Sequence, residues 1–101
     1  MTRMLLTALT ITSLGLVAPA YAAGDAAAGQ AKAGPCAVCH GPTGGGTAVG
    51  PKIAGKPAAD IVQALKDYQS GKRDNAMMKV QAGQLSAADM DNVAAYYAAI
   101  K

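Results

Sequence analysis

Cys36-Ala37-Val38-Cys39-His40 is the stretch on which the rest of this sequence depends. Two cysteines three positions apart lie on the same side of a helical turn, so both sulfurs can reach the two vinyl groups at one edge of a porphyrin. The histidine directly after the second cysteine then lies under the ring, where an imidazole nitrogen can bind iron. This spacing is the attachment signature of c-type haem. We therefore predict one covalent haem c, held by thioether bonds to Cys36 and Cys39, with His40 as an axial iron ligand.

Three other uses of these residues are weaker. A zinc site needs a fourth ligand, and the chain has no further cysteine or histidine. A thioredoxin-type redox pair needs a βαβ context, which the sequence lacks. A plain disulfide between Cys36 and Cys39 remains open in an exported protein, although it would leave His40 without a role.

Residues 1–22 have the pattern of a cleaved secretory signal peptide. Arg3 precedes a short apolar run, and an Ala-x-Ala pattern ends at Ala22. A retained membrane anchor is the alternative, but the run is short for a bilayer and is interrupted by threonine, glycine and proline. No twin-arginine pair is present. We expect export by the general secretion route, periplasmic localisation, no transmembrane anchor after cleavage, and a single domain over residues 23–101.

The composition of the mature chain also favours a cofactor. Removing residues 1–22 from the 101-residue sequence leaves 79 residues, and so small a chain usually needs disulfides, a metal or a cofactor to stabilise its core. The sequence has no Trp and no Phe, so a haem would supply the large apolar group that the side chains do not provide for the core. Without Arg3, eight Lys or Arg oppose six Asp, and this weak positive charge does not indicate nucleic-acid binding.

Capping residues and apolar spacing predict an all-α fold. Asp25 can cap the free amides of one helix, and Ser86-Ala87-Ala88-Asp89 has the form of a capping box that opens another. Ile61 and Leu65 recur at helical spacing. We expect about three to four helices, with the main ones over residues 25–33, 60–70 and 86–99, and loops over residues 41–57 and 76–84. No convincing strand appears in the sequence.

The sixth position of the iron would be filled by a methionine, since His40 is the only histidine. Met90 lies on the apolar stripe of the last predicted helix, which favours a place in the core. Met77 and Met78 lie in the predicted loop over residues 76–84, which can bring a sulfur over the opposite haem face. Adjacent residues of an extended segment point in opposite directions, so one would bind iron and the other would pack. Spacing alone does not decide between them.

From Gly24 to Ile100 the chain resembles a small bacterial class I c-type cytochrome, and especially one half of the dihaem periplasmic cytochromes. The motifs that carry the likeness are Cys-Ala-Val-Cys-His-Gly-Pro at 36–42, Gly-Pro-Lys-Ile-Ala-Gly at 50–55, Gly-Lys-Arg at 71–73, and Leu-Ser at 85–86 leading into Tyr-Tyr at 96–97. The resemblance implies the class I cytochrome c fold, with loops wrapped around one haem. It also implies that the first and last helices cross, with Gly29 allowing Tyr96 or its neighbour to approach.

The resemblance further implies roles for individual residues. In such proteins the axial methionine precedes the Leu-Ser pair by seven residues, and that position is Met78. A proline often stands beside this methionine, but here the flanking residues are others, which leaves Met77 as the alternative. The resemblance also implies that Pro51 offers a backbone carbonyl to the second ring nitrogen of His40, a contact that fixes the imidazole and raises its basicity.

An iron with histidine and methionine at both axial positions has no open site for a substrate. We therefore expect an electron carrier with no catalytic residues, which passes single electrons between periplasmic redox proteins. Exposed cations could steer it to acidic partners; the candidates are Lys52, Lys56, Lys72, Arg73 and Lys79. The alternatives are an electron-transfer subunit of a larger dehydrogenase or oxidase, and a ligand-binding or sensor haem with a displaceable methionine.

Overall fold

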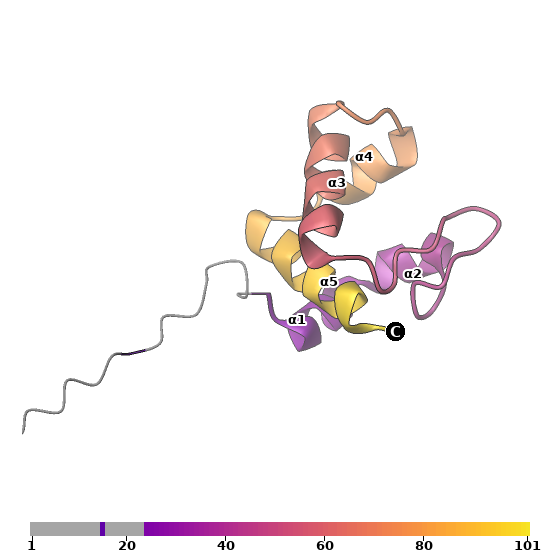
Figure 1. Ribbon diagram of the computed structural model, residues 1–101. Helices are drawn as coiled ribbons and strands as arrows, with labels where there is room; N and C mark the ends of the chain where they lie inside the picture. Colours follow the sequence, from indigo (N-terminus) through magenta and orange to yellow (C-terminus); the bar gives the residue numbers. More distant parts are fainter. Residues whose placement is uncertain (1–14, 16–23) are drawn as a thin grey trace, which may run out of the picture.

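The described part of the chain is built from α-helices joined by turns and one long loop (Figure 1). The computed structural model describes Gly15 and residues 24–101. Its five helices are α1 (Ala26–Lys32), α2 (Gly34–His40), α3 (Ala58–Ser70), α4 (Ala76–Gly83) and α5 (Ala87–Ala99). No strand occurs in residues 24–101. The all-α prediction is confirmed, with five helices where three to four were expected.

The predicted signal peptide lies outside the described residues, apart from Gly15. Its cleavage after residue 22 and the domain boundary at residue 23 therefore stay predictions. Within the described part, none of the helices has the length and apolar character needed to cross a bilayer.

The first and last helices cross at a glycine. A Cβ atom at Gly29 would lie 1.9 Å from the backbone oxygen of Asn92 and 2.9 Å from the backbone nitrogen of Val93, so a larger residue does not fit here. Beside the crossing, the Asp25 backbone N–H donates to Asn92 Oδ1 at 2.9 Å. The close approach expected at Gly29 is confirmed, but its partner is Asn92, one helical turn before Tyr96.

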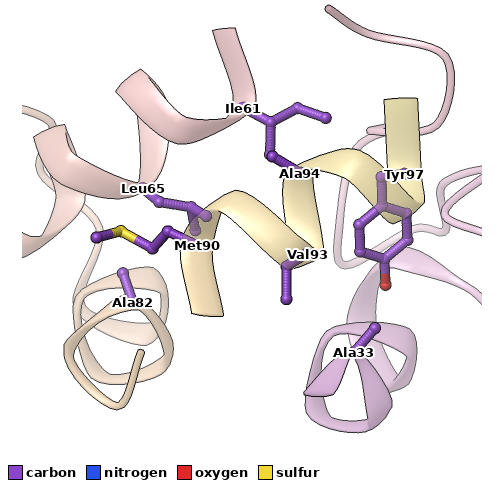
Figure 2. Close-up of a cluster of buried hydrophobic side chains, with 8 residues drawn as sticks. All are labelled: Ala33, Ile61, Leu65, Ala82, Met90, Val93, Ala94 and Tyr97. Atoms are coloured by element: carbon purple, nitrogen blue, oxygen red, sulfur yellow. The ribbon is translucent and has the colours of Figure 1, made fainter. Parts of the chain in front are cut away.

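The core is centred on α5, with α3 lying across one side of it and α1 against the other (Figures 1 and 2). Met90 is 4% exposed, and its side chain lies between Leu65 of α3 and Ala82 of α4 (Figure 2). The core prediction for Met90 is confirmed. The buried cluster consists of Ala33, Ile61, Leu65, Ala82, Met90, Val93, Ala94 and Tyr97. Four of these eight residues are alanine or valine, which agrees with the small core expected of so short a chain.

Side-chain caps fix where helices begin, and a glycine fixes where α3 ends. The Asp25 carboxylate accepts hydrogen bonds from two backbone amides in the first turn of α1. Ser86 Oγ accepts from the Asp89 amide at 3.0 Å while Asp89 Oδ2 accepts from the Ser86 amide at 3.1 Å, a complete capping box. Gly71 ends α3 with φ 81°, a left-handed conformation that favours glycine. All three helix boundaries agree with the sequence predictions.

Residues Ala76–Gly83 form α4, and the prediction of a loop over residues 76–84 is wrong. Asn75 is the N-cap of this helix, and its Oδ1 accepts from the Met78 amide at 3.0 Å. Asparagine is among the strongest N-cap residues, so the polar turn before residue 76 starts a helix. Met77 and Met78 are consequently about 100° apart around a helix axis, not on opposite sides of an extended segment.

Candidate haem-binding site

α2 carries the two cysteines on one of its turns. Gly34 and Pro35 open this helix, and proline is tolerated there because the first amides of a helix have no helical acceptor. Cys36 and Cys39 are free thiols, both partly exposed. Burial raises the pKa of the Cys36 thiol and so favours its protonated form. Both thiols are thus available for bond formation from the same helical turn.

His40 is the last residue of α2 and is 7% exposed. Its Nδ1 lies 2.7 Å from the backbone oxygen of Pro51. A carbonyl oxygen can only accept, so Nδ1 carries the proton and donates. In the neutral imidazole, Nε2 then presents its lone pair, which is the form of the ring that binds a metal. The structure therefore brings Pro51 to His40 and leaves one nitrogen available as a ligand.

The loop after α2 is held by hydrogen bonds to the haem-attachment motif at residues 36–40. The Gly46 amide donates to the His40 carbonyl at 2.8 Å, and the Thr47 hydroxyl donates to the Cys39 carbonyl. A Cβ atom at Gly50 would lie 2.5 Å from that Cys39 oxygen and 3.1 Å from His40 Nδ1. These contacts set the position of the Pro51 carbonyl.

Sequence reasoning did not identify Thr47 and Gly50 as parts of the site. Thr47 Oγ1 also accepts from the amides of Val49 and Gly50, at 3.2 and 3.3 Å. A hydroxyl that bonds the backbone two and three residues further on is a common turn, and this local pattern could have indicated Thr47. The need for glycine at position 50 depends on Cys39, eleven residues earlier, and no local pattern shows it.

A cleft of about 250 Å³ lies between α2 and α4, with Cys36 on one side and Met78 on the other. Leu65 and Leu85 contribute to its apolar wall. Met78 packs against the hydrophobic core, whereas the side chain of Met77 is 66% exposed. The structure thus brings Met78 to the cleft of Cys36 and directs Met77 to solvent.

The side chains of this cleft, together with those at the end of α2, suit a covalently attached haem. Cys36 and Cys39 offer two thiols for the porphyrin edge, His40 offers a neutral imidazole nitrogen, and Met78 offers a thioether. Iron already held by four porphyrin nitrogens needs two further ligands, and one imidazole with one thioether provides them. Apolar walls favour the flat, largely hydrophobic ring over water.

Comparison with known proteins identifies the family. Residues 22–96 match the family model described as cytochrome C oxidase, cbb3-type, subunit III. The chain belongs to this family and is a class I cytochrome c. Cytochrome c-554(548) from Halomonas halodenitrificans is 41% identical to it over 68 residues, which cover 63% of this chain and 82% of that protein. The cytochromes c of this class are electron carriers, and the two cysteines and one histidine of this chain account for a single covalent haem c.

Two other similar proteins are longer than this cytochrome. The thiosulfate dehydrogenase electron acceptor of Thiomonas intermedia is 40% identical over 68 residues, covering 65% of this chain and 31% of that protein. The structure of cytochrome c4 from Acidithiobacillus ferrooxidans matches with a TM-score of 0.71 and 31% identity, covering 74% of this chain and 49% of that one. The cytochrome thus spans about a third of the first protein and half of the second. The resemblance to one half of a dihaem cytochrome is confirmed.

Proposed function

We propose that this cytochrome passes single electrons between periplasmic redox proteins, with His40 and Met78 as the axial ligands of a haem attached at Cys36 and Cys39. The observation that carries the proposal is the placement of Met78 in the cleft of Cys36, while Met77 is 66% exposed. The hydrogen bond from His40 Nδ1 to the Pro51 carbonyl supports the other ligand, because it leaves Nε2 for iron.

The two ligands have different tasks. When bound, the haem supplies a one-electron couple between ferric and ferrous iron. The Pro51 carbonyl holds the His40 ring in one orientation and increases its basicity. Met78 contributes a soft thioether sulfur, which favours the ferrous state and raises the reduction potential. If both His40 and Met78 hold the iron in its two oxidation states, the residues around the haem would need to reorganise little when an electron arrives or leaves.

The surface beside the attachment cysteines is suited to partner docking. Val38, between the two cysteines, is 79% exposed, and Val49 in the following loop is 76% exposed. Exposed cations lie in the same loop and around α4; they are Lys52, Lys56, Lys72, Arg73 and Lys79. Such cations steer an acidic partner and raise the association rate, most strongly at low salt. We propose that donor and acceptor both present acidic side chains around an apolar centre.

A second candidate role is that of an electron-transfer subunit in a larger oxidase or dehydrogenase. The matching family model is described as an oxidase subunit, and one relative is named for its part with thiosulfate dehydrogenase. Purification of the tagged cytochrome from its native cells distinguishes the two roles. A partner retained in constant proportion through a high-salt wash supports the subunit, whereas release as a single haem protein supports the carrier.

Matched methionine variants test the ligand assignment. The unaltered protein should retain haem after denaturing electrophoresis and show the weak red charge-transfer band of methionine-bound ferric haem. Met78→Ala should lose this band and bind carbon monoxide in the reduced form, while Met77→Ala should behave as the unaltered protein. The reverse result would assign the ligand to Met77. Rapid carbon monoxide binding by the unaltered protein would favour the sensor alternative.

Fractionation and mass measurement test the proposed export. We expect the haem-bearing protein in the periplasmic fraction, with a mass that corresponds to haem plus residues 23–101. A mass that includes residues 1–22 would show that the predicted signal peptide is retained.

A further inference from the structure

α4 is a short helix that depends on contacts at both ends. It has eight residues, and an isolated helix of this length is not stable in water. At its N-terminus the Asn75 side chain caps the Met78 amide at 3.0 Å. At its C-terminus the side chain of Gln69, from the neighbouring helix α3, reaches across to it (the two helices lie side by side in Figure 1).

Gln69 bonds two backbone oxygens, one in the last turn of α4 and one just beyond the helix. Its Nε2 lies 2.6 Å from the Ala82 carbonyl and 3.1 Å from the Leu85 carbonyl. Both partners are acceptors, so the amide nitrogen faces them and both of its hydrogens are used. Ala82 is completely buried, and Gln69 is itself partly buried. A single side chain thus joins α3 to the last turn of α4 and to the start of the connection to α5.

We propose that Gln69 is a positioning residue that keeps Met78 at the haem iron. This inference rests on the proposed ligation by Met78. Movement of α4 away from α2, which carries Cys36 on the other side of the cleft, would carry Met78 away from the iron. Movement of α4 away from α3 breaks both bonds of Gln69, whereas local side-chain motion breaks neither. The two hydrogen bonds therefore favour the methionine-bound state over the displaced state.

Imidazole binding to the ferric haem protein measures this preference. Imidazole competes with Met78, so its apparent affinity rises when the methionine-bound state is weakened. In Gln69→Met the side chain keeps its length and loses its donors, and in Gln69→Glu it keeps its shape but can only accept at neutral pH. Two hydrogen bonds at the usual net strength of about 0.5–1.5 kcal/mol each correspond to imidazole binding that is tighter by roughly 5- to 150-fold. Gln69→Glu should have at least the effect of Gln69→Met, because its carboxylate repels the two carbonyls.

Two control variants separate positioning from general loosening. Gln63→Met removes an exposed amide bond on the same helix, from Gln63 Nε2 to Asp67 Oδ1 at 2.9 Å, without touching α4. Asn92→Ala removes the 2.9 Å bond to the Asp25 amide at the crossing of α1 and α5. Both should keep the imidazole affinity of the unaltered protein within twofold.

The results have distinct meanings. Tighter imidazole binding in the Gln69 variants alone supports the inference. The inference is overturned if the imidazole affinity of both Gln69 variants stays within twofold of that of the unaltered protein. It is also overturned if the control variants gain as much imidazole affinity as the Gln69 variants do. Absence of the red band in the unaltered protein would instead reject Met78 as a ligand, and the role of Gln69 with it.

Discussion

Replacement of Gly29 by alanine should separate α1 from α5. The new Cβ atom would lie 1.9 Å from the Asn92 oxygen, and the three atoms that it meets are all backbone atoms, which cannot rotate away. Overpacking of this kind costs about 3 kcal/mol or more, and the better helix propensity of alanine offsets about 1 kcal/mol of it. The net loss of about 2 kcal/mol or more corresponds to a fall in melting temperature of roughly 10 °C or more for a domain of this size.

Gly83→Ala is the matched control for this experiment. Gly83 is also helical, but a Cβ atom there meets nothing within 4 Å, so alanine should stabilise the protein by up to about 1 kcal/mol. Denaturant unfolding of the holoprotein, followed by far-ultraviolet circular dichroism, gives the free energy of unfolding for both variants. The two substitutions should therefore change the free energy of unfolding in opposite directions. A Gly29→Ala protein as stable as the unaltered one would refute the reasoning from this crossing.

Two further predictions concern the loop after α2 and the start of α5. Gly50→Ala places a Cβ atom 2.5 Å from the Cys39 oxygen and should lower the free energy of unfolding by about 1–3 kcal/mol. Gly45→Ala, with its nearest neighbour at 3.8 Å, should change it by less than about 0.5 kcal/mol. The hydrogen bond from the Ser86 amide holds the pKa of the Asp89 carboxyl below its usual range, so this carboxylate stabilises the fold above the unfolded pKa of about 3.9. The stability advantage over Asp89→Ala, measured by thermal unfolding, should be constant near neutral pH and should disappear as the pH falls through the lowered folded pKa; an advantage that persists at lower pH would contradict it.

The attachment motif and most helix boundaries could be predicted because their causes are local. Asp25, the capping box at Ser86 and Gly71 act within one helical turn, so short stretches of sequence contain the whole pattern. α4 was missed although its N-cap, Asn75, is also local. A segment of eight residues is too short to show a clear apolar periodicity around Met77 and Met78. The helix is stabilised by packing against α3, which the local sequence does not reveal.

The remaining features of the site depend on contacts between distant parts of the chain. Gln69 bonds carbonyls 13 and 16 residues further on, and no spacing rule connects a glutamine to such partners. The orientation of α4, which exposes Met77 and places Met78 at the cleft, likewise does not follow from spacing along the sequence. Gly29 could be suspected of close packing, but the sequence did not show that Asn92 is the residue it meets.

The crossing of α1 and α5 has a consequence for the order of events during biogenesis. It joins residues 67 positions apart, Asp25 and Asn92, so if the chain is exported as proposed, this closure would wait until nearly the whole domain had crossed the membrane. N-terminus-first export would deliver Cys36 and Cys39 well before α5. During that interval the thiols would belong to an open chain, to which haem could be attached before the helices close around it.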